Sequence, residues 1–367
     1  MKTKKVGIVT FHTGNNYGAV LQAYALQEYV SKLGYEVKIM DFNPTVYDTY
    51  DKIFKHVNNN WIKNLLHQLL QLLHYSELKK RRIRFEEFQK ANYKKTSKRY
   101  LTEEDFLTNH ELFDCYISGS DQVFNPRVKF SDVYFLSFEK LGSKKIAYAP
   151  SFGISEFTAE EKDRIRRHVA DFDFLSCRES SGAYFLSKLL GKPIPTVCDP
   201  VFLLDKNEWI NIAKRPGENK PYIFVYDLNG GQKLIDIAKK VSESYHIENI
   251  VCATLNTHSN YRGVKSIRSL GPRELLGFIN NADYIVTDSF HGTSLSLVMG
   301  KKVIPYIALA KASSRIESVM EKLGISGQII RTLDGCKDIN SIQFKQYTKE
   351  LDEYIKESKM FLQESLQ

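Results

Sequence analysis

The fold is decided by one stretch of the sequence, Asn281-Ala282-Asp283-Tyr284-Ile285-Val286-Thr287-Asp288-Ser289-Phe290-His291-Gly292-Thr293-Ser294-Leu295-Ser296. Its apolar, β-branched run from Tyr284 to Thr287 predicts a buried parallel strand. Small and polar residues follow as a tight turn, and the residues from about Thr293 to Met299 are suited to a helix. Ligands in open α/β sheets bind outside the carboxyl ends of strands, so His291 is a candidate functional residue. An alternative stays open, in which His291 caps the helix or fills the core.

Length and composition indicate an ordinary folded protein. The chain has 367 residues, which predicts two domains, and its apolar content of 43% and charged content of 26% are typical of soluble proteins. It lacks the run of about 18 apolar residues that a membrane-spanning helix requires. The basic residues at the N-terminus precede an apolar segment of only strand length, which is not a signal-peptide core. We therefore expect the protein in the cytoplasm or at the inner face of the membrane.

The sequence excludes several kinds of chemistry. Its five cysteines are widely separated and form no CxxC pair, so we expect reduced thiols near the core and neither a metal site nor a disulfide framework. The loop after the first predicted strand lacks both GxGxxG spacing and a Walker lysine, and no GxSxG elbow occurs. These absences argue against redox chemistry, nucleotide hydrolysis and proteolysis, and we expect no cofactor and no metal.

The net charge of +9 is concentrated in one segment. Its residues are Lys79, Lys80, Arg81, Arg82, Arg84, Lys90, Lys94, Lys95, Lys98 and Arg99. Aromatic residues are interleaved at helical spacing, which favours the solvated face of an amphipathic helix. The alternative is peripheral contact with anionic lipid or with a lipid-linked phosphate acceptor. No nucleic-acid module accompanies the segment, so no nucleic-acid partner is expected.

Strand and helix patterns alternate along the chain, which predicts an α/β protein with two Rossmann-like domains that face a cleft. We expect an N-terminal domain over residues 1–205, with a helical basic insertion at about 45–105 that includes a helix from Trp61 to Lys79. Residues 206–220 are polar and contain Pro216 and Gly217, which predicts a linker. A C-terminal domain over 221–345 and a final helix over 346–367 complete the chain.

Five polar turns follow predicted strands, and they are Gly14–Gly18, Ser118–Gln122, Arg178–Ser181, Tyr226–Gly230 and Asp288–Thr293. Their Arg, His, Ser, Asn and Gly residues suit the binding of a phosphorylated or carboxylated small molecule. Gly14–Gly18 is also compatible with a plain turn. Arg178 directly follows an apolar strand, so it is either an anion clamp or the structural partner of an acid such as Asp199.

Several motifs together resemble the polysaccharide pyruvyl transferase family. They are Gly7-Ile8-Val9-Thr10, Asn15-Asn16-Tyr17-Gly18-Ala19-Val20-Leu21-Gln22-Ala23-Tyr24-Ala25-Leu26, Ser118-Gly119-Ser120-Asp121-Gln122-Val123, Ala147-Tyr148-Ala149-Pro150-Ser151-Phe152-Gly153, Cys177-Arg178-Glu179-Ser180-Ser181, Cys198-Asp199-Pro200-Val201-Phe202-Leu203-Leu204 and Asp288-Ser289-Phe290-His291-Gly292. Each motif is weak alone, but their order and spacing are specific. The basic insertion and the C-terminal helix are not covered.

The resemblance implies a glycosyltransferase-B-like fold and a transferase that forms a pyruvate ketal on a sugar of a surface-polysaccharide precursor. Phosphoenolpyruvate is the implied donor, and a nucleotide-linked or lipid-linked sugar is the implied acceptor. In such enzymes an Arg and a His hold the donor, and the His can act as acid; here these are Arg178 and His291. Asp121 or Asp288 is a candidate base for the sugar hydroxyl.

One position departs from the family pattern. Many members carry an Arg two residues before the His, where this chain has Ser289. Arg315 is a candidate substitute, and its alternative role is that of an exposed or helix-capping residue. The expected substrate-binding residues are Asn15, Asn16, Gly18, Ser120, Asp121, Gln122, Asp288, Ser289, Gly292, Thr293 and Arg315. Two other functions stay open: a glycosyltransferase of the same fold with a nucleotide-sugar donor, and a non-catalytic protein that binds a sugar phosphate.

Overall fold

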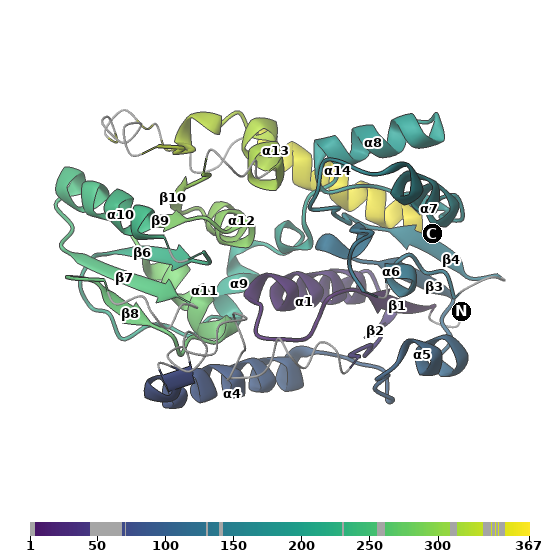
Figure 1. Ribbon diagram of the computed structural model, residues 1–367, viewed down its shortest axis with the longest axis horizontal. Coiled ribbons are helices and arrows are strands. Elements are labelled where there is room, and N and C mark those ends of the chain that lie inside the picture. The colour runs from purple at the N-terminus through teal and green to yellow at the C-terminus, as the bar shows by residue number, and fades with distance from the viewer. Residues whose placement is uncertain are drawn as a thin grey trace. The chain divides into compact units, whose positions relative to one another are not determined.

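The computed structural model describes residues 4–44, 68–69, 71–129, 131–138, 142–229, 231–254, 261–308, 314–332, 339, 342, 344 and 349–367. The chain divides into two compact units, each built around a parallel sheet (Figure 1). The N-terminal unit contains Met1–Asp48, Asn92–Leu204 and Lys349–Gln367. The C-terminal unit contains Thr49–Ala91 and Asp205–Thr348.

The sheet of the N-terminal unit has five parallel strands in the order β2-β1-β3-β4-β5. The strands are β1 (Lys5–Val9), β2 (Glu36–Ile39), β3 (Cys115–Ser118), β4 (Lys144–Ala147) and β5 (Phe174–Leu175). Nearly every residue of β1 and β3 is buried, because helices cover both faces of a parallel sheet. The helical elements are α1 (Tyr17–Lys32), α5 (Glu103–Asn109), η2 (Gln122–Phe124), α6 (Ser131–Tyr134), α7 (Ala159–Val169), α8 (Ser180–Leu190), η3 (Pro200–Phe202) and α14 (Lys349–Leu366).

The sheet of the C-terminal unit also has five parallel strands, in the order β10-β9-β6-β7-β8. The strands are β6 (Tyr222–Asp227), β7 (Asn249–Thr254), β8 (Lys265–Ile267), β9 (Tyr284–Thr287) and β10 (Lys302–Pro305). The helical elements are α4 (Tyr75–Asn92), α9 (Lys206–Ile212), α10 (Gln232–Tyr245), α11 (Pro272–Asn281), α12 (Phe290–Val298), α13 (Ser314–Lys322) and η4 (Ser326–Gln328). Among the described helices, none has the length and apolar character needed to cross a bilayer.

The expected linker begins with a helix. Asp205 accepts a hydrogen bond from the backbone N–H of Glu208, whose side chain accepts one from the N–H of Asp205 in return, and this capping box starts α9. Trp209 of α9 is fully buried. The linker interpretation is therefore wrong for Lys206–Ile212, because a capped helix with a buried tryptophan lies there.

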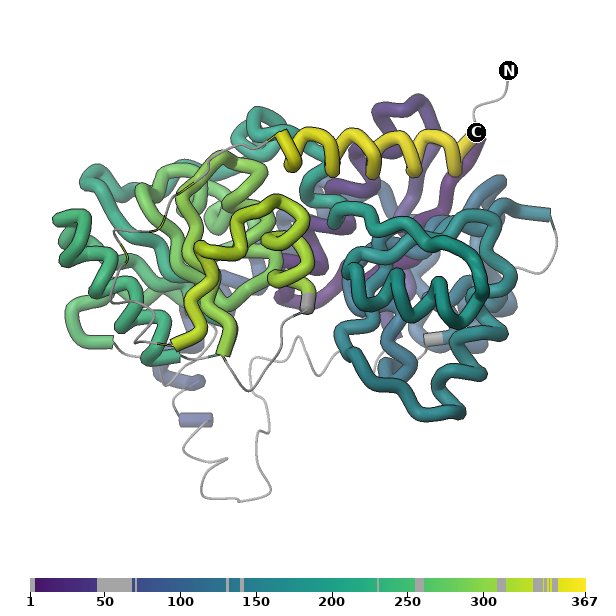
Figure 2. The backbone as a smooth tube through the Cα atoms, turned by 90° about the horizontal axis from the view of Figure 1, so that it is seen from above, coloured from purple at the N-terminus to yellow at the C-terminus, as the bar shows by residue number. Residues whose placement is uncertain are grey.

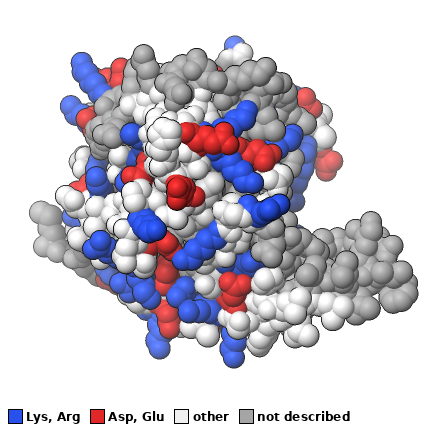
Figure 3. Space-filling model, turned by 90° about the vertical axis from the view of Figure 1, so that its left-hand side faces the viewer, with Lys and Arg blue, Asp and Glu red and all other residues white. Residues whose placement is uncertain are grey.

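The basic insertion also differs from the expected arrangement, because α4 packs within the C-terminal unit. The Nε atom of Arg84 lies 3.2 Å from a carboxylate oxygen of Glu274, and its Nη1 donates to the carbonyl oxygen of Ser269 at 2.7 Å. Through these contacts, part of the basic segment holds α4 in place. On the face that Figure 3 shows, basic and acidic side chains are interspersed. Of the helix predicted from Trp61 to Lys79, residues 61–67 and 70 lie outside the described residues, and its last part, Tyr75–Lys79, forms the start of α4.

The C-terminal helix α14 belongs to the N-terminal unit, and Figure 2 shows this helix in yellow beside the first part of the chain. The hydroxyl of Tyr35 donates to the carbonyl oxygen of Leu366 at 3.0 Å. The backbone N–H of Cys198 donates to the hydroxyl of Ser358 at 2.8 Å, inside the core. This second bond fixes the turn that contains Asp199.

We predict that Ser358→Ala destabilises the protein by about 1–3 kcal/mol, because it leaves the buried N–H of Cys198 without its acceptor. Ser365→Ala is the matched control, since both serines donate to the carbonyl oxygen four residues earlier in α14. Unfolding in urea, followed by circular dichroism, measures both variants. An equal loss of unfolding free energy in the two variants would contradict the role given to Ser358.

Candidate functional site

Each sheet has one point at which its strand order reverses. In the N-terminal unit the chain leads from β1 to β2 on one side and from β3 to β4 on the other. In the C-terminal unit it leads from β6 to β7 on one side and from β9 to β10 on the other. Ligands of open α/β sheets bind at such switch points, outside the carboxyl ends of the two strands. The polar turns Gly14–Gly18 and Ser118–Gln122 follow β1 and β3, and Asp288–Thr293 follows β9.

His291 lies in the first turn of α12, directly after the switch-point strand β9. The helix begins at Phe290, earlier than the sequence indicates, because Ser289 acts as its N-cap and accepts a hydrogen bond from the N–H of Gly292 at 3.1 Å. The alternative in which His291 caps the helix is therefore wrong. The exposed fraction of His291 is 8%. Ser289, the residue in the place of the expected arginine, has this capping role.

Gly292 packs α12 against the sheet. A Cβ atom on Gly292 would lie 2.7 Å from Cδ1 of Tyr226 and from Oγ1 of Thr287, so only glycine permits the close approach of helix and strands. The hydroxyl of Thr293 donates to the carbonyl oxygen of Ser289 at 3.0 Å, within the first turn of α12. Both residues were expected to bind substrate; the structure gives Gly292 a packing role and Thr293 a hydrogen bond within the helix.

Asp288 joins the turns after β9 and β6. One carboxylate oxygen accepts from the N–H of Leu228 at 3.0 Å and the other accepts from the side-chain amide of Asn229 at 2.6 Å. Burial raises the pKa of Asp288 above its usual value, against the opposing effect of these hydrogen bonds, and the nearby Asp227 raises it further. A carboxyl group with a raised pKa is suited to proton transfer near neutral pH.

Arg315, the candidate substitute cation, lies in the first turn of α13 and is partly exposed. This helix packs against α12, which carries His291. The structure therefore gives the two residues neighbouring helices in the same unit.

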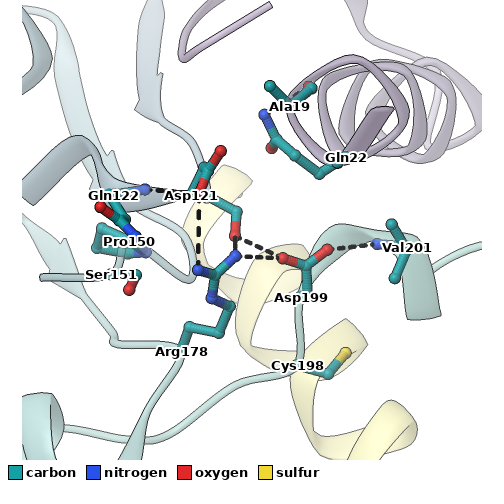
Figure 4. Close-up of polar contacts among 12 residues, drawn as sticks. Ala19, Gln22, Asp121, Gln122, Pro150, Ser151, Arg178, Cys198, Asp199 and Val201 are labelled. Atoms are coloured by element: carbon teal, nitrogen blue, oxygen red, sulfur yellow. Dashed lines mark hydrogen bonds and ion pairs between the residues drawn. The ribbon is translucent and has the colours of Figure 1, made fainter. Parts of the chain in front are cut away.

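Arg178 follows β5 in the N-terminal unit and is buried in an ion pair (Figure 4). Its Nη1 lies 2.6 Å from Oδ2 of Asp199 and donates to the hydroxyl of Ser120 at 3.2 Å. Its Nη2 lies 3.8 Å from Oδ1 of Asp121. Burial alone would lower the pKa of Arg178, but the carboxylates of Asp199, Asp121 and Glu179 outweigh it and raise that pKa. The structure thus contains the pairing with Asp199 that the sequence left open.

Asp121 has a strained backbone next to this ion pair. Its φ of 71° lies in the region that non-glycine residues rarely adopt. Its carboxylate accepts from the N–H of Gln122 at 2.9 Å and so caps the short helix η2. Strain of this kind is concentrated at binding and catalytic sites, which supports the inclusion of the Ser120–Gln122 turn in the candidate site.

The loop after β1 is a capped helix start. The side chain of Asn16 accepts from the N–H groups of Gly18 and Ala19, at 3.0 and 3.3 Å, and so satisfies donors of α1 that were expected to face an anion. Asn15 is partly exposed, and Gly18 is buried.

The sequence interpretation gave no role to two buried acids. Asp227, inside the predicted turn Tyr226–Gly230, ends β6 and accepts from Gly231, Thr254 and Tyr261. Asp41 follows β2, and His12, Lys95 and Arg99 surround its carboxylate. The apolar run of β6 was a signal for Asp227, whereas the mixed sequence of β2 gave none for Asp41.

Solved structures with the same fold support the two-unit architecture. UDP-GlcNAc 2-epimerase from Neisseria meningitidis bound to UDP-GlcNAc has 12% identity and a TM-score of 0.50, covering 99% of each chain. The Methanocaldococcus jannaschii UDP-GlcNAc 2-epimerase in complex with UDP-GlcNAc and UDP has 13% identity and a TM-score of 0.50, covering 98% of each chain. The expected glycosyltransferase-B-like fold class, with two parallel sheets, is confirmed.

Sequence comparison identifies the family. No curated protein matches the chain significantly. The family model described as polysaccharide pyruvyl transferase, however, matches residues 16–308 and therefore spans the motifs that follow β3, β5 and β9. With most of its length inside this match, the chain belongs to the polysaccharide pyruvyl transferase family, a family of transferases.

Proposed function

We propose that the protein transfers the carbon skeleton of phosphoenolpyruvate onto two hydroxyls of a sugar in a surface-polysaccharide precursor. The products are a pyruvate ketal and inorganic phosphate. Family membership supports the reaction class. The observation that carries the proposal is the position of His291, buried in the first turn of α12 at the switch point of the C-terminal sheet.

The reaction requires one proton donor and one proton acceptor. Protonation of the methylene carbon of phosphoenolpyruvate creates an oxocarbenium centre, and the first sugar hydroxyl adds to it. Departure of phosphate regenerates the cation, and the second hydroxyl closes the ketal. Of the two hydroxyl protons, one replaces the proton given to the methylene carbon and the other leaves with phosphate. We assign the first protonation to His291 as general acid.

Asp288 is the better of the two candidate bases. Its pKa is raised by burial and by Asp227. Asp121, in contrast, lies 3.8 Å from a guanidinium nitrogen of Arg178 and is engaged in an ion pair. A base with a higher pKa removes a hydroxyl proton more readily. Asp288 and His291 are also three residues apart at the same strand end. In this scheme Arg178 positions the Ser120–Asp121 turn, and Arg315 is the candidate cation for the donor.

We predict that His291→Gln abolishes phosphate release from phosphoenolpyruvate in the presence of acceptor, with a loss of at least about 100-fold, because glutamine cannot act as an acid. His246→Asn is the control, since this histidine belongs to the same unit and has a left-handed backbone that asparagine tolerates. Phosphate release by a coupled assay measures both. Full activity of His291→Gln would remove the residue from the mechanism.

Asp288→Asn should lower kcat by about 100-fold or more and remove the acidic limb of the pH–rate profile, because this limb reports the ionisation of the base. In the wild-type enzyme, the apparent pKa of this acidic limb should be higher than the usual pKa of an aspartate, because the pKa of Asp288 is raised. Asp121→Asn should keep kcat within about tenfold and retain the limb. The reverse pattern would assign the base to Asp121.

Arg178→Met should destabilise the protein by about 3–5 kcal/mol, because the buried carboxylate of Asp199 loses its cation. The double variant Arg178→Met with Asp199→Leu should recover most of the unfolding free energy. If Arg178 only positions the Ser120–Asp121 turn, the double variant should bind phosphoenolpyruvate with unchanged affinity, and its kcat should fall. Loss of that affinity in a folded double variant would show instead that Arg178 clamps the donor. Urea unfolding and calorimetric titration provide the two measurements.

The second candidate function is a glycosyltransferase with a nucleotide-sugar donor, favoured by the fold shared with proteins whose structures contain UDP-GlcNAc. A thermal shift with nucleoside diphosphates, together with no shift and no phosphate release with phosphoenolpyruvate, would select it over pyruvyl transfer.

A further inference from the structure

The N-terminal unit contains two cationic side chains and a histidine around one buried carboxylate. We call this group the Asp41 cluster, and it consists of His12, Asp41, Lys95 and Arg99. The Nε2 atom of His12 lies 3.1 Å from Oδ1 of Asp41. Nζ of Lys95 and Nε of Arg99 lie 3.0 and 3.2 Å from Oδ2. Burial alone would raise the pKa of Asp41, but His12 and Lys95 outweigh burial and hold that pKa well below its usual value.

Each ring nitrogen of His12 faces an oxygen atom in this arrangement. Its Nδ1 atom lies 3.0 Å from the carbonyl oxygen of Thr10, and its Nε2 faces the Asp41 carboxylate. Lys95 and Arg99 share the same single carboxylate. Two cations thus face one anion, and the cluster carries a surplus of positive charge.

The cluster lies at the carboxyl ends of β1 and the edge strand β2, beside the switch point between β1 and β3. His12 belongs to the loop after β1, and Asp41 follows β2. The hydroxyl of Tyr93 donates to the carbonyl oxygen of Val20 in the first part of α1, and the rings of Tyr93 and His12 are 6.4 Å apart. The surplus charge therefore borders the end of the sheet at which α/β proteins bind ligands.

Both cations are accessible to a ligand. The side chain of Arg99 is 54% exposed and that of Lys95 is 23% exposed, whereas Asp41 is 7% exposed. Arg99 uses only Nε toward Asp41, and a guanidinium has further donors in a fork that matches phosphate. Arg178 offers no such surplus, because Asp199 and Asp121 flank its buried side chain.

We propose that the Asp41 cluster is the place at which the protein binds the diphosphate that links the acceptor sugar to its nucleoside or polyprenyl carrier. The proposal rests on the proposed function for the identity of the ligand. Lys95 and Arg99 contact the phosphate oxygens, and Asp41 with His12 holds these two side chains at the sheet end. The sugar then lies on the side of the carboxyl ends of the strands.

Calorimetric titration of the full chain with sodium pyrophosphate, UDP and farnesyl diphosphate tests the site. Lys95→Gln and Arg99→Gln should each weaken binding by about tenfold, the usual effect of one lost charge-assisted hydrogen bond. Lys98→Gln is the control, because it removes one charge from the same segment, where Lys98 is 48% exposed and pairs with Asp105. This control should bind within about twofold of the wild type. Circular dichroism checks that all three variants fold.

The UDP and farnesyl diphosphate probes distinguish a nucleoside carrier of the diphosphate from a lipid carrier. Binding of UDP or of farnesyl diphosphate, weakened in Lys95→Gln and Arg99→Gln, supports the site and identifies the nucleoside or the lipid as the carrier. Absence of binding by all three probes, or an equal loss in Lys98→Gln, overturns the proposal. Titration measures binding without turnover, so its result is independent of the phosphate-release assay. Failure to release phosphate from phosphoenolpyruvate would count against the proposed function alone.

Discussion

The buried pair of Arg178 and Asp199 holds together the part of the N-terminal unit on which the candidate site depends. Two charges this far from water are stable only when further hydrogen bonds satisfy them. Here the hydroxyl of Ser120 and the N–H of Val201 donate to Asp199, at 3.0 and 3.1 Å. The pair thus joins the turn after β3, the turn after β5 and the start of η3. The bond from Cys198 to Ser358 connects the same region to α14.

This pair also determines where positive charge is available. The guanidinium of Arg178 is neutralised by the acids around it, and its side chain is 2% exposed. At the other side of the switch point, the cations around Asp41 outnumber the carboxylate, and Arg99 is largely exposed. An anionic substrate is attracted to a surplus of positive charge, which is why we propose the Asp41 cluster, and not Arg178, as the anion site of this unit.

The C-terminal unit has a different character, because its switch point carries a histidine and two acids. Asp288 and His291 lie at the end of β9, and Asp227 lies at the end of the neighbouring β6. The capping of α12 by Ser289 places His291 inside the first helical turn. The packing of Gly292 against Tyr226 then fixes that turn to the sheet. The residue that replaces the expected arginine is thus part of the framework that positions the histidine.

The sequence by itself determined the strand β9, the polar turns and the candidate histidine, because buried parallel strands are apolar runs and their ends carry small and polar residues. It placed the start of α12 at Thr293, since the capping hydrogen bond of Ser289 cannot be recognised from periodicity. Only the tertiary structure decided which charges pair. Asp41 meets Arg99, 58 residues later in the chain, because the segment around Lys95 and Tyr100 lies along the edge of β2. Electrostatic pairing depends on distances of a few ångströms between side chains, and the sequence specifies such distances only through the folded chain.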